Sequence, residues 1–330
     1  MRVNRVEAIA LRDEKTHRFP EFSAPSIIIA GGHDVPHHSA GEAYPDIDPA
    51  PIMVGWINGE DGAGDVYTAL SRDGGRTWDT PRLLRTVDER SRYGSVTLFA
   101  EDQFSYAFLG PEASGDPVAE ATNLLAYVTS DLGETWRPLD VLVECESRLV
   151  TGGRLLSYCG HYLLPVHAGG RAGEGEQFQS ALLSEDLVHW RRGGVVPGSI
   201  EAALSDGHIT HTQPGEHENG LIMVMRESNG RGTGSKSADG HARFSLSDDC
   251  GESWSAASPY PEVPSLDARI FFATDSLGRY VTVFNATPDR RSLKVRVKEP
   301  RGPWGPVRDF PGPGLQNQDV DAVTFADIEF

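Results

Sequence analysis

Histidine gathers in two stretches of this sequence where its chemistry could be used. Three histidines lie in each stretch: His33, His37 and His38 in the first, and His208, His211 and His217 in the second. An imidazole can act as a general acid or base near pH 7. With Asp34 or Glu216, two or three imidazoles could instead hold a metal ion, but their spacings match no zinc pattern. We therefore predict no metal and no other cofactor, and polar loop histidines without chemistry remain the alternative.

A glycine-rich acidic stretch is the second chemical feature. Residues 58–65 read Asn-Gly-Glu-Asp-Gly-Ala-Gly-Asp, which places Glu60, Asp61 and Asp65 close together. A carboxyl group near other buried carboxylates has a raised pKa, which suits proton donation near neutral pH. The stretch is thus a candidate acid site, and a solvated acidic turn is the alternative.

Charge and composition limit the partners. The 330 residues include 48 acidic and 30 basic side chains, a formal net charge of −18. This balance argues against a nucleic-acid partner, because counterion release needs clustered Lys and Arg. No apolar run approaches the roughly 18 residues that span a bilayer, so no membrane partner is expected. The composition does not determine the oligomeric state.

The cysteines and the first residues bear on localisation. Cys145, Cys159 and Cys250 are odd in number and have no metal-site spacing. They favour a reduced compartment over a disulfide framework. The first 18 residues lack the apolar segment of a signal peptide. We predict a cytoplasmic protein, and a secreted domain without its leader is the alternative.

A tryptophan-containing motif repeats along the chain. The pattern S/T-x-D-x-G-x-T/S-W fits residues 71–78, 129–136 and 247–254, with a shortened copy at 184–190 and a worn one at 299–304. Asp and Ser side chains can bond the amides of a tight turn, and Gly accepts a positive φ. The Trp is expected to pack beneath the turn. The period of about 56 residues divides the chain into nearly six units.

Short β-strands are predicted around each copy of the motif. Runs of four to six residues rich in β-branched and aromatic side chains lie at 65–70, 123–128, 221–225 and 280–284. Four short strands and their turns fit one blade of a propeller. The sequence therefore predicts an all-β fold: a single six-bladed β-propeller domain over residues 1–330. Both chain ends would together build the last blade.

These repeats resemble the Asp-boxes of the sialidase (neuraminidase) superfamily, which are also called BNR repeats. The resemblance runs from about residue 18 to the last residues. It implies three arginines that hold the carboxylate of an acidic sugar. Arg18 in Arg-Phe-Pro, Arg226 after the strand at 221–225, and Arg290 or its neighbour Arg291 match the family's motifs. A guanidinium is always charged and offers a flat fork of donors to an anion.

The resemblance also implies two catalytic carboxylates and a nucleophile. Asp61 matches the family's general acid/base, with Glu60 as the alternative, and Glu201 matches the carboxylate that activates the nucleophile. The family's nucleophile is a tyrosine, but Asn317 or Gln318 stands at that position. We assign Asn317 to substrate binding, because an amide cannot form the glycosyl ester that a phenolate forms.

The resulting expectation is a sialidase-like exo-glycosidase that cleaves a terminal acidic sugar from a glycan or glycoside. Without the tyrosine it would be an inverting hydrolase, or a polysaccharide lyase assisted by histidine. A non-catalytic propeller that binds an acidic saccharide, as a lectin does, is the alternative from a different class. A scaffold for protein partners is a further one.

Overall fold

The protein is described by a computed structural model, which covers residues 22–30, 51–58, 64–86, 92–112, 124–145, 149–168, 178–213, 220–227, 240–265, 268–287 and 292–310. Within these ranges every regular element is a β-strand. None of the described residues forms a helix long and apolar enough to cross a membrane.

The strands form five sheets, which we call blades. Four of them are four-stranded, antiparallel and follow the chain in order. The first contains β1 (Phe22–Ile29), β2 (Ile52–Asn58), β3 (Asp65–Ser71) and β4 (Arg82–Arg85). The second contains β5 (Arg92–Glu101), β6 (Phe104–Glu112), β7 (Leu125–Thr129) and β8 (Arg137–Leu139). The fourth contains β15 (Leu204–His211), β16 (Leu221–Glu227), β17 (His241–Ser247) and β18 (Ser258–Pro264). The fifth contains β19 (Phe271–Thr274), β20 (Tyr280–Asn285), β21 (Leu293–Lys298) and β22 (Arg308–Asp309).

The third blade is irregular. Its main order is β10 (Leu149–Thr151), β12 (His161–Ala168), β13 (Gln179–Ser184), β14 (His189–Arg192) and β9 (Leu142–Glu144). β9 pairs parallel to the outer strand β14. β11 (Leu156–Tyr158) also pairs with β12, so the innermost strand is divided between β10 and β11.

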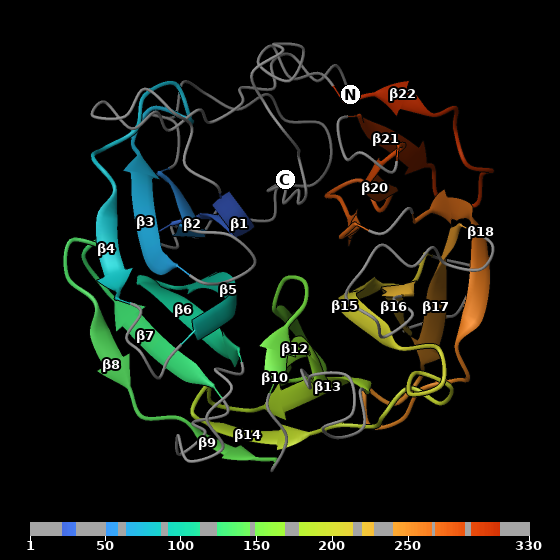
Figure 1. Cartoon of the computed structure of the whole chain (residues 1–330), viewed down its shortest axis with the longest axis horizontal. Coiled ribbons are helices and arrows are strands. Elements are labelled where there is room, and N and C mark those ends of the chain that lie inside the picture. The colour runs from blue at the N-terminus through green and yellow to red at the C-terminus, as the bar shows by residue number, and fades with distance from the viewer. Residues whose placement is uncertain are drawn as a thin grey trace.

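The blades stand around a common axis with their first strands innermost, which is the arrangement of a β-propeller (Figure 1). The predicted fold class is therefore confirmed, with five blades in the described residues. The predicted count of six is not confirmed, because the sixth blade would require residues 1–21 and 311–330, which lie outside the described residues. The strands predicted at 65–70, 221–225 and 280–284 coincide with β3, β16 and β20.

The Asp-box turns are closed by their own side chains. In the second copy, the Asp131 carboxylate accepts bonds from the Thr135 amide at 2.9 Å and the Thr135 hydroxyl at 2.6 Å. The Gly133 amide donates to the Thr129 hydroxyl at 3.0 Å. The Thr129 hydroxyl in turn donates to the Asp131 carboxylate at 2.6 Å. This bond first, and then the two from Thr135, lower the pKa of Asp131 to about 2. The repeat is thus a structural motif, as the sequence predicted.

The tryptophans fill the space between blades. Trp190 has only 1% of its surface exposed and donates its indole N–H to the Leu187 carbonyl at 3.0 Å. Its ring meets the edge of Phe108 from the second blade at 5.4 Å between centroids. Burial of large aromatic side chains contributes strongly to stability, so this turn motif also anchors the third blade against the second.

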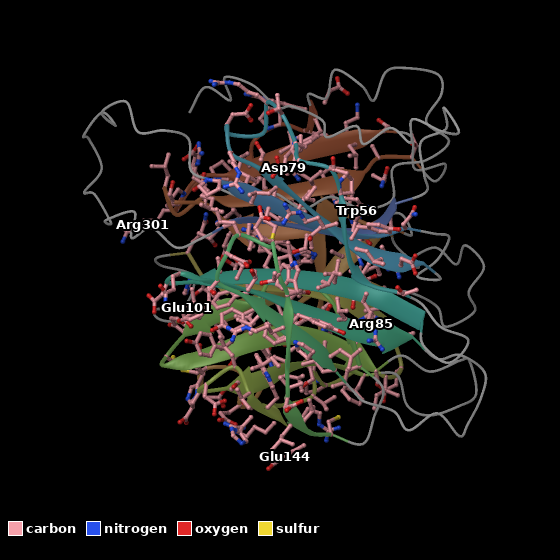
Figure 2. The ribbon with its side chains drawn as sticks, turned by 90° about the vertical axis from the view of Figure 1, so that its left-hand side faces the viewer. Trp56, Asp79, Arg85, Glu101, Glu144 and Arg301 are labelled. Carbon is pink, nitrogen blue, oxygen red and sulfur yellow. A yellow bond between two sulfur atoms is a disulfide. The ribbon has the colours of Figure 1, made fainter. Side chains whose placement is uncertain are left out.

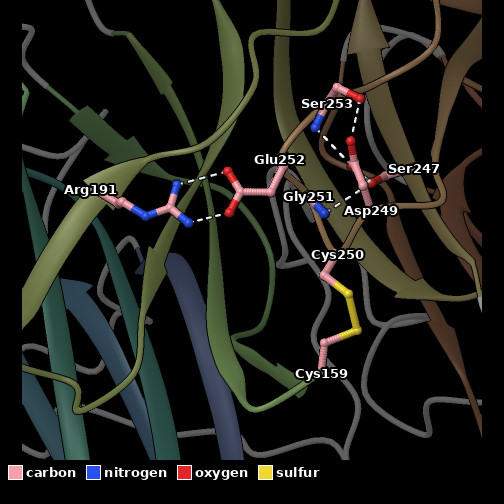
Figure 3. Close-up of a disulfide and its surroundings, with 8 residues drawn as sticks. All are labelled: Cys159, Arg191, Ser247, Asp249, Cys250, Gly251, Glu252 and Ser253. Carbon is pink, nitrogen blue, oxygen red and sulfur yellow. Dashed lines mark hydrogen bonds and ion pairs between the residues drawn. A yellow bond between two sulfur atoms is a disulfide. The ribbon is translucent and has the colours of Figure 1, made fainter.

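A disulfide corrects the prediction made for the cysteines. Cys159, in the turn between β11 and β12, is bonded to Cys250 in the third full Asp-box (Figure 3). Only Cys145 is free. The bond links the third blade to the fourth across a sequence separation of 91 residues. Spacing could not reveal the pair, because its partners lie in different blades.

The two ends of the propeller differ, and we name them by their residues. The Asp-box face is the end that carries the turns 71–78, 129–136, 184–190 and 247–254. The arginine face is the opposite end, where Asn58 pairs with Asp65 and Ser205 pairs with Arg226. In the side view, Glu101 lies toward the Asp-box face and Arg85 toward the arginine face (Figure 2).

Candidate functional site

The arginine face is where most of the predicted site segments join the blades. The chain enters β1 there, since Phe22 pairs with Asn58. Residues 59–63 connect β2 to β3 at this end. Residues 288–291 follow Ala286, whose amide donates to the Ser292 carbonyl beside the Asn285–Leu293 pair. Arg18, Asp61, Arg290 and Asn317 themselves lie outside the described residues.

Arg226 is the predicted site residue that the structure places in a defined environment. It is the last residue but one of strand β16, and 20% of its side chain is exposed. Its Nη2 lies 2.9 Å from Oδ2 of Asp206, and its Nε donates to the Ser205 hydroxyl at 3.4 Å. The sequence predicted this arginine as a substrate contact, and the structure adds a buried carboxylate beneath it.

A second arginine shares that carboxylate. Arg269 precedes the first strand of the fifth blade, and its Nε donates to Oδ1 of Asp206 at 2.7 Å. The side chains of Arg269 and Asp206 are 11% and 4% exposed. Each carboxylate oxygen therefore binds a different guanidinium, and charge-assisted bonds of this kind are short and directional.

Asp206 reaches both arginines because its strand contains a bulge. The register of β15 against β16 shifts between Ser205 and His208, and Asp206 has a φ of 53°. The third blade packs closely on this bulge: the Gly153 amide donates to the Gly207 carbonyl at 2.8 Å. A Cβ at Gly152 would lie 2.5 Å from the same carbonyl oxygen. Such bulges re-aim a side chain, here toward the arginines.

Burial and charge set the protonation of the cluster. Burial would raise the pKa of Asp206, but Arg269, Arg226 and His167 outweigh it and hold that pKa below its usual range. Burial lowers the pKa of His167 to about 4 and that of His208 to about 3. Near neutral pH the carboxylate is ionised and both imidazoles are neutral, so these five side chains carry a net charge of +1.

Arg154 brings a further positive charge toward the axis. It lies in the break between β10 and β11, and its Nη2 donates to the Ile27 carbonyl of β1 at 2.9 Å. The second blade stands between the first and the third (Figure 1), so this bond joins two blades that are not neighbours in the ring. Its charge also lowers the pKa of His208.

The structure describes Glu201 and part of the second histidine stretch. Glu201 lies exposed in the turn before β15, and its catalytic role remains a prediction. His208 and His211 belong to strand β15, so these two are not loop histidines. Residues 31–50 and 212–220 connect strands at the Asp-box face, where Ile29 pairs with Ile52 and His211 pairs with Leu221. Residues 31–50 and 212–220 are therefore attached at the end away from Arg226, whereas His208 belongs to the Asp206 cluster.

Sequence reasoning missed three members of this cluster: Asp206, Arg269 and His167. A Gly inside a strand pattern indicates a bulge, and Gly207 is the sequence signal that could have pointed to the bulge at Asp206. No signal in one sequence points to Arg269, because it approaches Asp206 only after two blades have packed. Among the described residues no group of three or more His, Cys, Asp or Glu could hold a metal ion.

The sequence matches the family model described as BNR repeat-like domain over residues 52–311. The chain belongs to this family. No protein of curated function matches it by sequence.

Solved structures of sialidases have the same fold. NanB sialidase from Streptococcus pneumoniae, as its K499G mutant, matches with a TM-score of 0.61 and 10% identity, over 91% of this chain. This chain spans only 63% of the NanB chain. The intramolecular trans-sialidase from Ruminococcus gnavus matches with a TM-score of 0.56 and 14% identity, over 84% of this chain and 80% of its own. A protein of unknown function from Dyadobacter fermentans matches with a TM-score of 0.57 and 14% identity, over 90% of this chain and 85% of its own. At these identities the likeness establishes the fold alone.

Proposed function

We propose that this protein is a sialidase-like exo-glycosidase that removes a terminal acidic sugar from a glycan or glycoside. The observation that carries the proposal is the partly exposed Arg226 guanidinium, fixed on buried Asp206 at the arginine face. The segments that contain Arg18, Asp61 and Arg290 are attached at the same face. A set of guanidiniums there would hold the sugar carboxylate.

The proposed reaction is a direct displacement at the anomeric carbon. Asp61 protonates the leaving oxygen, a water molecule attacks the opposite face of the sugar, and Glu201 takes the proton of that water. Asn317 stands where a nucleophilic tyrosine is expected, and its amide forms no covalent glycosyl intermediate. The product should therefore have an inverted anomeric configuration.

A panel of aryl glycosides and acidic oligosaccharides tests this proposal, with the first product anomer followed by NMR. Arg226→Ala should weaken the binding of an acidic substrate about 100-fold, because the loss of a hydrogen bond to a charged group costs about 1.5–3 kcal/mol. Arg301→Ala is the control: Arg301 is exposed at the other face. Asp61→Asn should lower turnover about 10² to 10⁴-fold. If Arg226→Ala and Arg301→Ala weakened binding equally, Arg226 would not be the contact of the sugar carboxylate.

A second candidate is a propeller that binds an acidic saccharide without cleaving it. The amide at position 317 favours this candidate, because the family's nucleophile is missing. Calorimetric binding of an acidic oligosaccharide with no released sugar, even after long incubation, would identify this function. Release of free sugar, lost in Asp61→Asn, would exclude it.

A further inference from the structure

Arg269, Asp206 and Arg226 form a chain of ion pairs from the fifth blade into the fourth. Arg269 binds one oxygen of Asp206 at 2.7 Å, and Arg226 binds the other at 2.9 Å. The exposed fractions of their side chains are 11%, 4% and 20%. The guanidinium of Arg226 is therefore the most accessible of the three charges, and the other two lie behind it.

Asp206 is held so firmly that it can serve as a fixed support. Its backbone is in the left-handed region, with a φ of 53°, inside the bulge of β15. A Cβ at Gly207 would lie 2.5 Å from the Gln179 side chain, and the Asp206 amide donates to Nδ1 of His167 at 3.4 Å. The third blade thus encloses the bulge, and the carboxylate has little freedom to follow a moving arginine.

We propose that Arg269 and Asp206 are positioning residues that fix the guanidinium of Arg226 for a ligand with a single negative charge, such as a sugar carboxylate. This rests on the proposed function, because it concerns the same acidic-sugar site. Within this group, two guanidiniums and one carboxylate leave one net positive charge, which favours an anionic ligand. A fixed guanidinium also loses less conformational entropy on binding than a mobile one.

The proposal differs from simple attraction between charges in a way that can be measured. Asp206→Asn removes a negative charge, so charge alone predicts tighter binding of an anion. Arg269→Gln removes a positive charge, so charge alone predicts weaker binding. If the two residues act by positioning Arg226, both substitutions weaken binding although they change the net charge in opposite directions.

The binding experiment uses 3′-sialyllactose as probe and calorimetry at pH 7. Asp206→Asn and Arg269→Gln should each weaken its affinity about tenfold, and Arg269→Lys about threefold, because lysine keeps the charge but lacks the planar fork. Arg279→Gln is the matched control: Arg279 is also 11% exposed and paired with a buried carboxylate, that of Asp275. It should keep the affinity of the unaltered protein. Tighter binding by Asp206→Asn would overturn the proposal.

A turnover assay gives the same test in kinetic form. In Asp206→Asn and Arg269→Gln the KM should rise while kcat stays within about twofold of the unaltered protein.

A second measurement needs no ligand. The Nε–Hε signal of Arg226, assigned with Arg226→Lys, should shift or broaden in both Asp206→Asn and Arg269→Gln and stay in place in Arg279→Gln. An unchanged signal in folded Arg269→Gln would overturn the positioning role, whatever sugar binds. The unaltered protein could fail to bind 3′-sialyllactose while the Arg226 signal still shifts in both variants. In that case the positioning role stands and the proposed function fails for that sugar.

Discussion

The two faces of this propeller use aspartate in opposite ways. On the Asp-box face, Asp131 is satisfied by residues at most four positions away in its own turn. On the arginine face, Asp206 is satisfied by Arg226 from the neighbouring strand and by Arg269, 63 residues away in another blade. A turn that closes on itself can be repeated in any blade, whereas the Asp206 cluster exists only where three blades meet.

From this difference we expect substitutions on the Asp-box face to change stability and substitutions on the arginine face to change ligand binding. The Asp-box residues bond within their turns, so a change there should alter folding and leave ligand binding intact. Asp206 is buried, Arg226 and His167 are partly exposed, and the three polar groups depend on one another. Such networks are costly when one member is lost. Each of the following changes tests one side of this contrast.

The largest stability effect is expected from the disulfide on the Asp-box face. Replacing Cys159 and Cys250 together by serine should lower the free energy of unfolding by about 4 kcal/mol, because the bond closes a loop with a sequence separation of 91 residues. Denaturant unfolding measures the loss, with Cys145→Ser as the control. Affinity of the folded double variant for an acidic sugar should not change. A parallel loss of affinity would show that the two faces are coupled.

The same contrast explains which parts of the structure the sequence could predict. The Asp-box turns and the strands beside them follow from local patterns, and the sequence placed both correctly. The Cys159–Cys250 bond and the Asp206–Arg269 pair join residues from different blades. Their partners are not related by any fixed spacing, so a single sequence holds no signal for them. Arg226 was predicted as a substrate contact because it follows a clear strand in a motif of the resemblance, and that role stays a prediction.

Acid should destabilise the arginine face before the Asp-box face. The pKa values of His167 and His208 are lowered from 6.5 to about 4 and about 3 by burial. Below pH 6.5 these two histidines therefore bind protons in the unfolded chain but stay neutral in the folded protein. Stability is complete above that pH and falls as the pH decreases, by about 2 kcal/mol per histidine between pH 7 and 5. The Asp-box carboxylate of Asp131, with a pKa of about 2, should release its stabilisation only below about pH 4.

Unfolding by urea at several pH values measures this order of events. His208→Asn should flatten the curve between pH 7 and 5, because one of the two buried imidazoles is removed. A stability that stays constant from pH 7 to 5 in the unaltered protein would contradict the buried, neutral state of these histidines.

The junction beneath Asp206 should be intolerant of a single methyl group. In Gly152→Ala the new Cβ would lie 2.5 Å from the Gly207 carbonyl oxygen and 2.9 Å from its nitrogen. Both are backbone atoms, so the bulge itself must move, at a cost of about 2–3 kcal/mol. Because the bulge carries Asp206, affinity for an acidic sugar should fall as well. Gly302→Ala is the control, since its Cβ would meet the nearest atom at 3.4 Å. Equal stability of the two variants would mean that the junction is less tightly packed than the structure indicates.

The smallest effect is expected from an ion pair whose geometry is as good as that of the Asp206 cluster. Arg191 and Glu252 form two parallel bonds between the third and fourth blades on the Asp-box face, but their side chains are 44% and 47% exposed (Figure 3). Solvent and salt screen such a pair, so a double-mutant cycle with Arg191→Gln and Glu252→Gln should give a coupling of about 0.5 kcal/mol. The same cycle with Arg269→Gln and Asp206→Asn should give a coupling several times larger, because removing one partner leaves a buried charge unpaired. Equal coupling energies would show that burial does not distinguish the two faces, and the contrast drawn between them would then fail.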